Sequence, residues 1–359
     1  MKNNLSIVIA TLNEEGNIQE LYNEIDNNLK KIDITWEIIF VDDDSSDRTV
    51  DIINQLRDKY DNVFLIKRYD KRGLSSALIT GALSSNSNYI LFMDADLQHN
   101  PKYIIDLYNR IKNSNYHLVS ASRFMNNKKI LNNKRYRLSN LVNIILQKLF
   151  NIKYNDILTG YFIIEKKFFL KHLRKFSSKG FKILLDIILS TKHLIKYDEI
   201  SFNFQPRFSG TSKLNNKIVI DFVYLVLDKT IGKFIPARYI IYSFVGLTGA
   251  FFQLLSFYFL FKILNFNLSL IISIIIAMSI NFILNNEFTY SDLKLKRLNF
   301  FYGLIKFYFF CSFGALFNFL TAKLTFEYSS IIFFSIFLGA LVGSIWNYSM
   351  NKSFNWKDV

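Results

Sequence analysis

The sequence has little cysteine, proline or histidine for its 359 residues, with one cysteine, Cys311, and three prolines. A single cysteine excludes an intramolecular disulfide and a zinc cluster held by thiolates. The four histidines lack metal-ligand spacing, and we expect them on the surface or in loops: His99, His117, His172 and His193. The amino terminus, MKNNLSIVIA, lacks the long apolar run of a signal peptide, so we expect no export.

Charge is scarce in the second half of the chain. Residues 238–359 hold 9 Lys+Arg and 4 Asp+Glu, whereas residues 1–237 hold 35 and 25. Three uncharged runs each reach the about 20 residues that span hydrocarbon, namely 239–261, 263–286 and 328–351. A fourth span, about 307–326, contains Lys323 near its end, where a long side chain can reach the interface. We therefore expect an all-α membrane domain of four helices.

Basic residues are distributed unevenly among the loops of this half. One side carries Lys294, Lys296, Arg297, Lys352 and Lys357, and the other mainly Lys262 and Lys323. Since cytoplasmic loops are enriched in lysine and arginine, we expect the amino-terminal half and the carboxyl-terminal tail on the cytoplasmic face. On a membrane protein the net charge of +15 suits anionic lipid head groups and phosphorylated substrates, and we expect no nucleic-acid partner.

The first half alternates apolar runs with polar loops and helical patterns. LSIVIATLNE (5–14), WEIIFVDDDS (36–45) and YILFMDAD (89–96) each read as a buried strand that runs into a polar loop. Strand, loop and helix in repetition predict a parallel, doubly wound sheet covered on both faces. In such sheets the carboxyl ends of the strands open into the ligand crevice, so the three loops should meet there.

Two further segments have amphipathic helical patterns. Residues 135–150 carry an apolar face of Leu138, Leu141, Val142, Ile145 and Leu149, and residues 217–234 carry a similar one. Packing on the sheet and lying in the lipid head-group region both remain open for these helices.

The membrane half contains an internal duplication. SINFILNNEFTY (279–290) aligns with SIWNYSMNKSFNW (344–356), which pairs Asn281 with Asn347 and Asn285 with Asn351. GAFF (249–252) likewise matches GALF (314–317). The pattern predicts two helical hairpins of similar design, in which we expect the asparagines and glycines to be packing residues rather than a transport path.

Acidic residues follow two of the predicted strands. Asp94, Asp96 and the amide of Gln98 offer the hard oxygen ligands that Mg²⁺ or Mn²⁺ prefers, and such a metal commonly bridges nucleotide phosphates. The run 42–44 of three aspartates could accept hydrogen bonds from a base or ribose.

Four motifs in this order, IVIATLNEE, VDDDSSDRT, KRGLSSALITGAL and MDADLQH, resemble the polyprenyl-phosphate glycosyltransferases of family 2, which have the GT-A fold. The resemblance covers about residues 5–213, and the last half resembles the GtrA-type membrane domain. It implies a Rossmann-like α/β GT-A domain (1–213, including the amphipathic helix at about 135–150), an interface helix (214–236) and a four-helix transmembrane domain (237–359). Glycine is usual in the family where Asp44 stands, so we expect an altered loop geometry there.

The resemblance also implies the site residues. The implied nucleotide contacts are Thr11, Asn13, Glu14, Asp42, Asp94, Arg207 and Ser212, and the implied metal ligands are Asp96 and Gln98. The residues implied to act in catalysis are Asp94, Asp96, Arg123, Arg135, Ser139, Asp156, Arg207 and Lys213. Arg137 is a rival of Arg135 for the acceptor phosphate, and Asp156 could instead be a turn residue.

The implied reaction is an inverting sugar transfer that needs Mg²⁺ or Mn²⁺. RGLSSA favours the dolichyl-phosphate mannose synthase subgroup, and hence mannose transfer from GDP-mannose to dolichyl or another polyprenyl phosphate. The alternatives are transfer from UDP-glucose or UDP-N-acetylhexosamine to undecaprenyl phosphate, and a lipid-linked sugar flippase. A processive synthase is disfavoured because the QxxRW motif of that group is absent.

Overall fold

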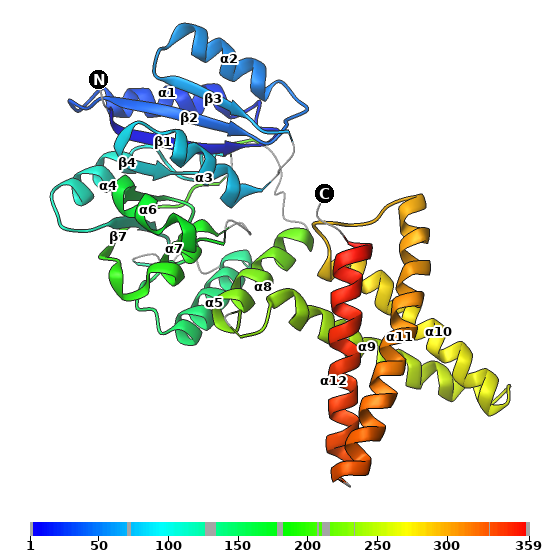
Figure 1. The fold of residues 1–359 in the computed structure, drawn as a ribbon. Helices are drawn as coiled ribbons and strands as arrows, with labels where there is room; N and C mark the ends of the chain where they lie inside the picture. The colour runs from blue at the N-terminus through cyan, green and yellow to red at the C-terminus, as the bar shows by residue number, and fades with distance from the viewer. Residues whose placement is uncertain are drawn as a thin grey trace. The chain divides into compact units, whose positions relative to one another are not determined.

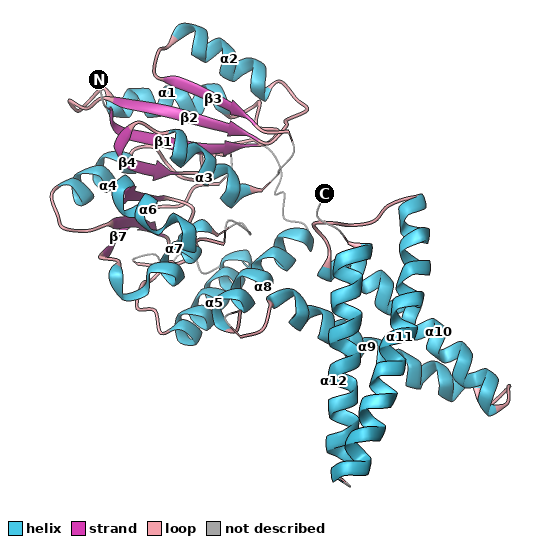
Figure 2. Cartoon of the chain, viewed as in Figure 1, coloured by secondary structure: helices cyan, strands magenta, loops and turns pink. Residues whose placement is uncertain are grey.

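The computed structural model describes residues 3–69, 73–125, 134–177, 182–206, 208–209, 216–232, 234–329 and 331–356. The chain divides into two units, Met1–Lys229 and Thr230–Val359, and each is considered by itself. Figure 1 shows the course of the chain and Figure 2 its helices and strands.

The first unit is built on a seven-stranded sheet. Its strands are β1 (Asn3–Thr11), β2 (Trp36–Asp42), β3 (Val63–Lys67), β4 (Ser87–Phe92), β5 (Leu118–Ser122), β6 (Phe162–Glu165) and β7 (Tyr197–Ser201), in the spatial order β3-β2-β1-β4-β6-β5-β7. Parallel pairing aligns Thr11 with Asp42 at the carboxyl ends of β1 and β2. The polar loops after these strands therefore open at one edge of the sheet, as the sequence predicts.

The expectation of a wholly parallel sheet is wrong for one strand. β6 runs antiparallel to both of its neighbours, β4 and β5. It follows the loop after α5 and enters the sheet from the end opposite to that of β4 and β5, so it pairs with both of them in the antiparallel sense. The fold is a mixed α/β sheet of the GT-A, Rossmann-like type.

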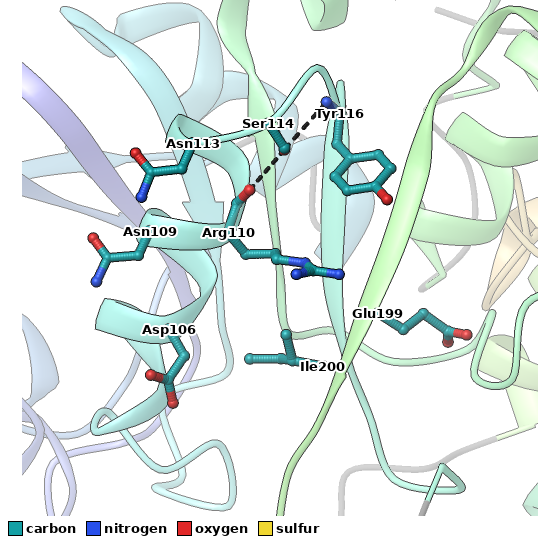
Figure 3. Close-up of a pocket in the computed structure, with 8 residues that line it drawn as sticks. All are labelled: Asp106, Asn109, Arg110, Asn113, Ser114, Tyr116, Glu199 and Ile200. Carbon is teal, nitrogen blue, oxygen red and sulfur yellow. Dashed lines mark hydrogen bonds between the residues drawn. The ribbon is translucent and has the colours of Figure 1, made fainter.

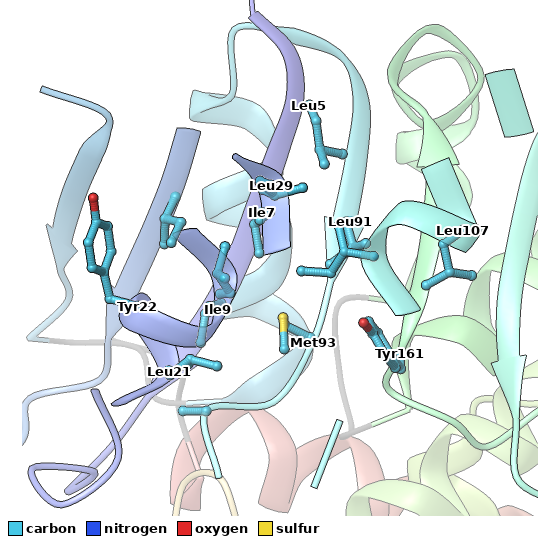
Figure 4. Close-up of a cluster of buried hydrophobic side chains, with 14 of the residues drawn as sticks. Leu5, Ile7, Ile9, Leu21, Tyr22, Leu29, Leu91, Met93, Leu107 and Tyr161 are labelled. Carbon is cyan, nitrogen blue, oxygen red and sulfur yellow. The ribbon is translucent and has the colours of Figure 1, made fainter. Parts of the chain in front are cut away.

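Eight α-helices accompany the sheet in the described part of the first unit. They are α1 (Ile18–Leu29), α2 (Thr49–Lys59), α3 (Leu74–Ser84), α4 (Tyr103–Lys112), α5 (Lys134–Phe150), α6 (Lys166–His172), α7 (Ile183–Thr191) and α8 (Asn216–Thr230). Alternate residues of β1 supply two hydrophobic cores, because successive side chains of a strand point to opposite faces. Ile7 and Ile9 pack with α1 and α4 (Figure 4), whereas Val8 packs with α3, α6 and α7.

The two amphipathic helices are oriented differently. In α8, Leu225 is buried in the second core, and Lys229 forms an ion pair of 2.7 Å with Asp186 of α7. In α5, Leu146 is buried in the same core, but the face that carries four other large apolar residues is exposed: Leu138, Leu141, Ile145 and Leu149. Thus α8 packs on the domain, whereas the apolar face of α5 is exposed among the described residues.

The second unit consists of helices, as the charge-free runs predict. They are α9 (Ala237–Leu260), α10 (Phe266–Leu284), α11 (Leu298–Ser329) and α12 (Ile332–Met350). Among the described residues, three stretches are long and apolar enough to cross a membrane: Ala237–Leu260, Ile271–Thr289 and Leu298–Asn318. The expected four helices are present, and three of them meet this requirement within the residues described.

The duplication read from the sequence is visible as two equivalent close approaches. A Cβ added at Gly249 of α9 would overlap Oδ1 of Asn281 in α10, and one added at Gly314 of α11 would overlap Oδ1 of Asn347 in α12. Each hairpin then ends in a π-helical turn, Asn285–Thr289 and Asn351–Asn355. The aligned residues therefore have the same packing role in both hairpins, as the sequence predicts.

Candidate active site

The loops that follow β1 and β2 are joined by hydrogen bonds to a buried carboxylate. Asp42 is fully buried and accepts hydrogen bonds from the Thr11 hydroxyl at 3.0 Å and from the Ser45 amide at 2.9 Å. Asn13 has a left-handed backbone (φ 52°), and its Oδ1 accepts a hydrogen bond from the Ser46 amide at 2.8 Å. The amide of Glu14 donates to Thr49 at 2.7 Å. The structure thus brings together the four predicted nucleotide contacts of this region.

The acidic loop after β4 is fixed by a buried histidine. His99 is stacked on Tyr161 with 5.0 Å between ring centres, and its Nδ1 accepts a hydrogen bond of 3.0 Å from the Asp94 amide. Burial lowers the pKa of His99 to about 3, so the ring is neutral. The expectation of surface or loop histidines is wrong for His172, which is buried in α6, whereas His99 is a loop residue that is buried. The carboxylate of Asp94 remains 44% exposed.

The same loop carries the predicted metal ligands. Asp96 is largely buried and its Oδ1 accepts a hydrogen bond from the Gln98 amide at 3.2 Å. The side-chain nitrogen of Gln98 donates to the carbonyl of Gln205 at 3.1 Å, which makes its carbonyl oxygen the end suited to a cation. Within the described residues no three His, Cys, Asp or Glu side chains form a metal cluster. The carboxylate of Asp96 with the amide oxygen of Gln98 fits a hard cation whose other ligands come from a diphosphate and water.

A segment from beyond β7 runs along this loop. The Gln205 amide donates to the carbonyl of Gln98 at 3.2 Å, and the Phe208 amide donates to that of Asp96 at 3.4 Å. A Cβ added at Gly16 would lie 2.8 Å from Oγ of Ser209, so the segment also reaches the loop after β1. The predicted residues Arg207, Ser212 and Lys213 belong to this part of the chain but lie outside the described residues.

Arg123 directly follows β5. The carboxylate of Asp156 binds its side chain, and the carboxylate of Glu199 binds the loop that carries Asp156. Asp156 is fully buried and accepts from Nε of Arg123 at 2.7 Å and from its Nη2 at 2.8 Å. Glu199 of β7 accepts from the Asp156 amide at 2.9 Å and from the Asn155 amide at 2.7 Å, and burial raises its pKa. Asp156 therefore orients Arg123, and the alternative of a simple turn residue does not account for these bonds.

Helix α5 is tied to the same loop. Asn143 is buried; its amide nitrogen donates to the carbonyl of Asn155 at 2.6 Å, and its Oδ1 accepts from the Ile157 amide at 3.1 Å. Residues four apart lie on one face of a helix, so positions 135, 139 and 143 share the face that meets the loop. Ser139 is half-buried and Arg137, off this face, is exposed. The side chain of Arg135 lies outside the described residues.

Sequence reasoning missed Lys182, which precedes α7. Its Nζ donates to the carbonyl of Leu158 at 2.7 Å. Burial and the neighbouring Arg123 lower the pKa of Lys182 to about 8, while Asp94 and Asp156 oppose the shift. The only signal in the sequence is a lysine placed directly before the apolar run ILLDIIL, which is compatible with many roles. Gly160 lies close to the acidic loop, because an added Cβ would lie 3.3 Å from Oδ1 of Asp94.

A pocket on another part of the first unit holds none of the predicted site residues. It is lined by Asp106, Asn109, Arg110, Asn113, Ser114, Tyr116, Glu199 and Ile200 (Figure 3). Of these, Glu199 also contacts the Asp156 loop. The chemistry of the chain is therefore assigned to the loops described above.

Comparison with known proteins covers both units. Glycosyl transferase family 2 matches residues 6–173, and the GtrA/DPMS transmembrane domain matches residues 241–356. A dolichol-phosphate mannosyltransferase of Pyrococcus furiosus is 32% identical over 98% of this chain and 99% of that protein. One of Saccharomyces cerevisiae is 29% identical over 64% of this chain and 88% of that protein. A solved glucosyl-3-phosphoglycerate synthase of Mycobacterium tuberculosis, with Mn²⁺ and UDP-glucose, has a TM-score of 0.49 and 15% identity, covering 63% of this chain and 79% of that chain.

Proposed function

The chain belongs to glycosyl transferase family 2 and carries a GtrA/DPMS transmembrane domain, and on this premise we propose that it transfers mannose from GDP-mannose to dolichyl or another polyprenyl phosphate. The chain is a glycosyltransferase and an integral membrane protein. The names of its relatives support polyprenyl-phosphate mannosyl transfer. GDP as the nucleotide and dolichol as the lipid are part of the proposal.

One observation carries the proposal. Asp156 holds Arg123 in a fixed orientation, and Arg123 and Asp94 of the acidic loop are both close enough to Lys182 for their charges to act on it. Guanidinium groups bind phosphate oxygens by forked hydrogen bonds. In this reading Arg123, Arg135 and Ser139 hold the acceptor phosphate, and Asp94 faces the sugar of the donor. Position 135 is preferred to 137 because it shares the inward face of α5.

The acceptor needs positioning rather than activation. The second pKa of a phosphate monoester is about 6, so at neutral pH it is already an anionic nucleophile and no protein base has to remove a proton. An acceptor oxygen attacks the anomeric carbon from the side opposite the diphosphate, the bond from that carbon to the diphosphate oxygen breaks, and the nucleoside diphosphate leaves with the electron pair. Attack from the far side inverts the anomeric centre.

The donor is held by the loops after β1, β2 and β4. Thr11, Asn13, Glu14 and Asp42 shape the nucleotide site. Asp96 and Gln98 would hold Mg²⁺ or Mn²⁺, which when bound neutralises charge on the departing diphosphate. Arg207, Ser212 and Lys213 are proposed to contact the same diphosphate, because Gln205 and Phe208 on either side of Arg207 bond to the acidic loop.

The membrane arrangement follows from charge and from α5. The basic loop and tail residues support a catalytic unit on the cytoplasmic face. The exposed apolar face of α5 suits a helix lying in the head-group region, which would bring Ser139 to the level of a lipid phosphate. A polyprenyl phosphate could then reach the site without leaving the bilayer.

The test is a donor screen on the purified full chain with polyprenyl phosphate. Labelled GDP-mannose, UDP-glucose and UDP-N-acetylglucosamine are each supplied with Mg²⁺, with Mn²⁺ or with a chelator, and label in the lipid is measured. We expect label from GDP-mannose only, its loss on chelation, and a rate at least about 100-fold lower in Asp96→Asn. Label from a UDP-sugar alone would show that the donor is this UDP-sugar and not GDP-mannose. Lipid translocation without any sugar transfer would favour a flippase.

A further inference from the structure

We propose that Lys182 is a phosphate-binding residue of the acceptor site, where its ammonium group acts beside the guanidinium of Arg123. The inference deepens the proposed function and rests on it for the identity of the acceptor. It concerns a residue that lies in none of the four sequence motifs, 60 positions or so from Arg123 in the chain.

The position of Lys182 is fixed at both ends of its side chain. Its backbone immediately precedes α7, whose residues from Ile183 to Leu189 are all buried. Its Nζ donates to the carbonyl of Leu158, two residues after Asp156. An ammonium group has three N–H donors, so anchoring to one carbonyl is compatible with binding an anion through another.

The balance of charge around Arg123 favours a further cation, in addition to the proposed Arg135, when a phosphate binds. Asp156 already engages Arg123 through both arms of the guanidinium fork, and this buried pair is close to neutral as a unit. A phosphate monoester brings a charge of about −1.5 to −2 at pH 7. Lys182 is a cation close enough to Arg123, Asp94 and Asp156 for their charges to act on it.

The cost of keeping a cation at this position supports the assignment. Burial lowers the pKa of Lys182, and Arg123 lowers it further. A side chain that merely filled the space before α7 could be neutral at no such cost. A bound phosphate would offset the repulsion between Lys182 and Arg123 and thereby stabilise the charged form of Lys182.

A rival reading is that Lys182 only braces Leu158 or the carboxylate of Asp94. That role predicts a loss of donor binding or of stability, whereas phosphate binding predicts a change in the KM of the lipid alone. The two readings are separated by kinetics on purified full-length protein with polyprenyl phosphate and the nucleotide sugar that the donor screen identifies.

For Lys182→Gln we expect the KM for polyprenyl phosphate to rise about 10- to 100-fold, the loss of one charge-assisted hydrogen bond. The KM for the nucleotide sugar should change less than about threefold, which corresponds to a free energy well below that of one such hydrogen bond. Lys182→Arg should restore most of the lipid affinity because it keeps the charge. The matched control is Lys167→Gln, an exposed lysine of α6 that should leave both constants unchanged. An unchanged lipid KM in Lys182→Gln, or an equal rise in both constants, overturns the inference.

A second measurement needs no variant and no catalysis. The wild-type chain is treated with an amine-acetylating reagent, and modification of Lys182 is followed by mass spectrometry with polyprenyl phosphate or with uncharged polyprenol. Phosphate-specific slowing of modification is expected at Lys182 and not at Lys167; equal rates with both lipids contradict the inference. If the wild type transfers no sugar to polyprenyl phosphate, the proposed function fails, while this assay still decides whether Lys182 binds the phosphate.

Discussion

Asp156 and Arg123 form a forked, buried ion pair, with 2.7 Å between Nε and Oδ2 and 2.8 Å between Nη2 and Oδ1. The carboxylate also accepts a hydrogen bond from the amide of Arg123 at 3.1 Å, so both the backbone and the side chain of the arginine are held. Glu199 fixes the loop of Asp156 in turn. The arginine is therefore ordered before any ligand binds, which lowers the entropy cost of phosphate binding.

We expect Asp156→Asn to destabilise the first unit by about 3–5 kcal/mol, because it leaves a buried guanidinium without its counter-charge. The side chain of Asp156 is 0% exposed and that of Arg123 is 11% exposed, so water cannot replace the lost partner. Denaturant unfolding of the full chain measures this change. Where the variant still folds, its KM for polyprenyl phosphate should rise because Arg123 is no longer oriented.

The matched control is Asp198→Asn, which breaks the pair of Asp198 with Arg110. The two charged atoms are 2.6 Å apart, but the arginine side chain is 54% exposed. A solvated pair contributes about 0–1 kcal/mol, so the control should scarcely change the free energy of unfolding. Equal losses in the two variants would contradict the role given to burial.

A second prediction concerns the link between α5 and the Asp156 loop. Asn143→Ala removes the donor to the Asn155 carbonyl and the acceptor of the buried Ile157 amide, which should cost about 1–3 kcal/mol. Because α5 carries Arg135 and Ser139, the lipid KM should rise more than the donor KM. Both are measured in the transfer assay.

The control for α5 is Asn109→Ala, at an exposed position of α4. It should leave stability and both KM values near those of the wild type. If Asn143→Ala lowers stability but leaves the two KM values in their original ratio, then Asn143 stabilises the fold and does not position the acceptor site.

The sequence predicts the parts of this site that local patterns encode. An apolar run followed by acidic residues identifies the ends of β1, β2 and β4, and parallel pairing then brings the loops together, as the register of Thr11 with Asp42 confirms. The uncharged runs likewise predict the helices of the second unit. Both depend on strong local signals of hydrophobicity.

Contacts between distant segments account for what could not be predicted. β6 is four residues long, and its antiparallel direction depends on the return of the chain from α5. His99 stands in a polar motif, yet it is buried by Tyr161 and Phe202 from later in the chain. Lys182 is assigned to the site by its bond to Leu158, 24 residues away. The spacing of hydrophobic residues along the sequence does not predict such contacts between distant segments.

The loop residue Asp44 allows a test of backbone strain. The family usually has glycine at this position, and Asp44 adopts φ 63°, in the left-handed region. Asp44→Ala and Asp44→Gly both remove the carboxylate, so the difference between them measures the effect of the backbone conformation on stability. We expect the glycine variant to be more stable than the alanine variant by about 1 kcal/mol, because a Cβ is unfavourable at positive φ. Equal free energies of unfolding would show that the loop relaxes.

The last prediction concerns the paired glycines of the second unit. Gly249→Ala and Gly314→Ala should each lower the thermal stability of the full chain in detergent, because the new methyl group would meet the side chains of Asn281 and Asn347. Helix propensity alone would predict the opposite, since alanine is favoured over glycine by about 1 kcal/mol in a helix interior. The sign of the effect therefore reports on packing between the two helices of each hairpin.

Gly246 in α9 is the internal control, because an added Cβ would meet nothing within 4 Å. Gly246→Ala should leave the unfolding temperature unchanged or raise it, as propensity predicts. Combining Gly249→Ala with Asn281→Ala should recover part of the lost stability, since the second change removes the side chain that blocks the methyl group. The same rescue by Asn347→Ala in the second hairpin would show that the duplicated motif is a packing device in both halves. If all three single glycine variants behave alike, the close approach of glycine and asparagine does not stabilise the hairpins.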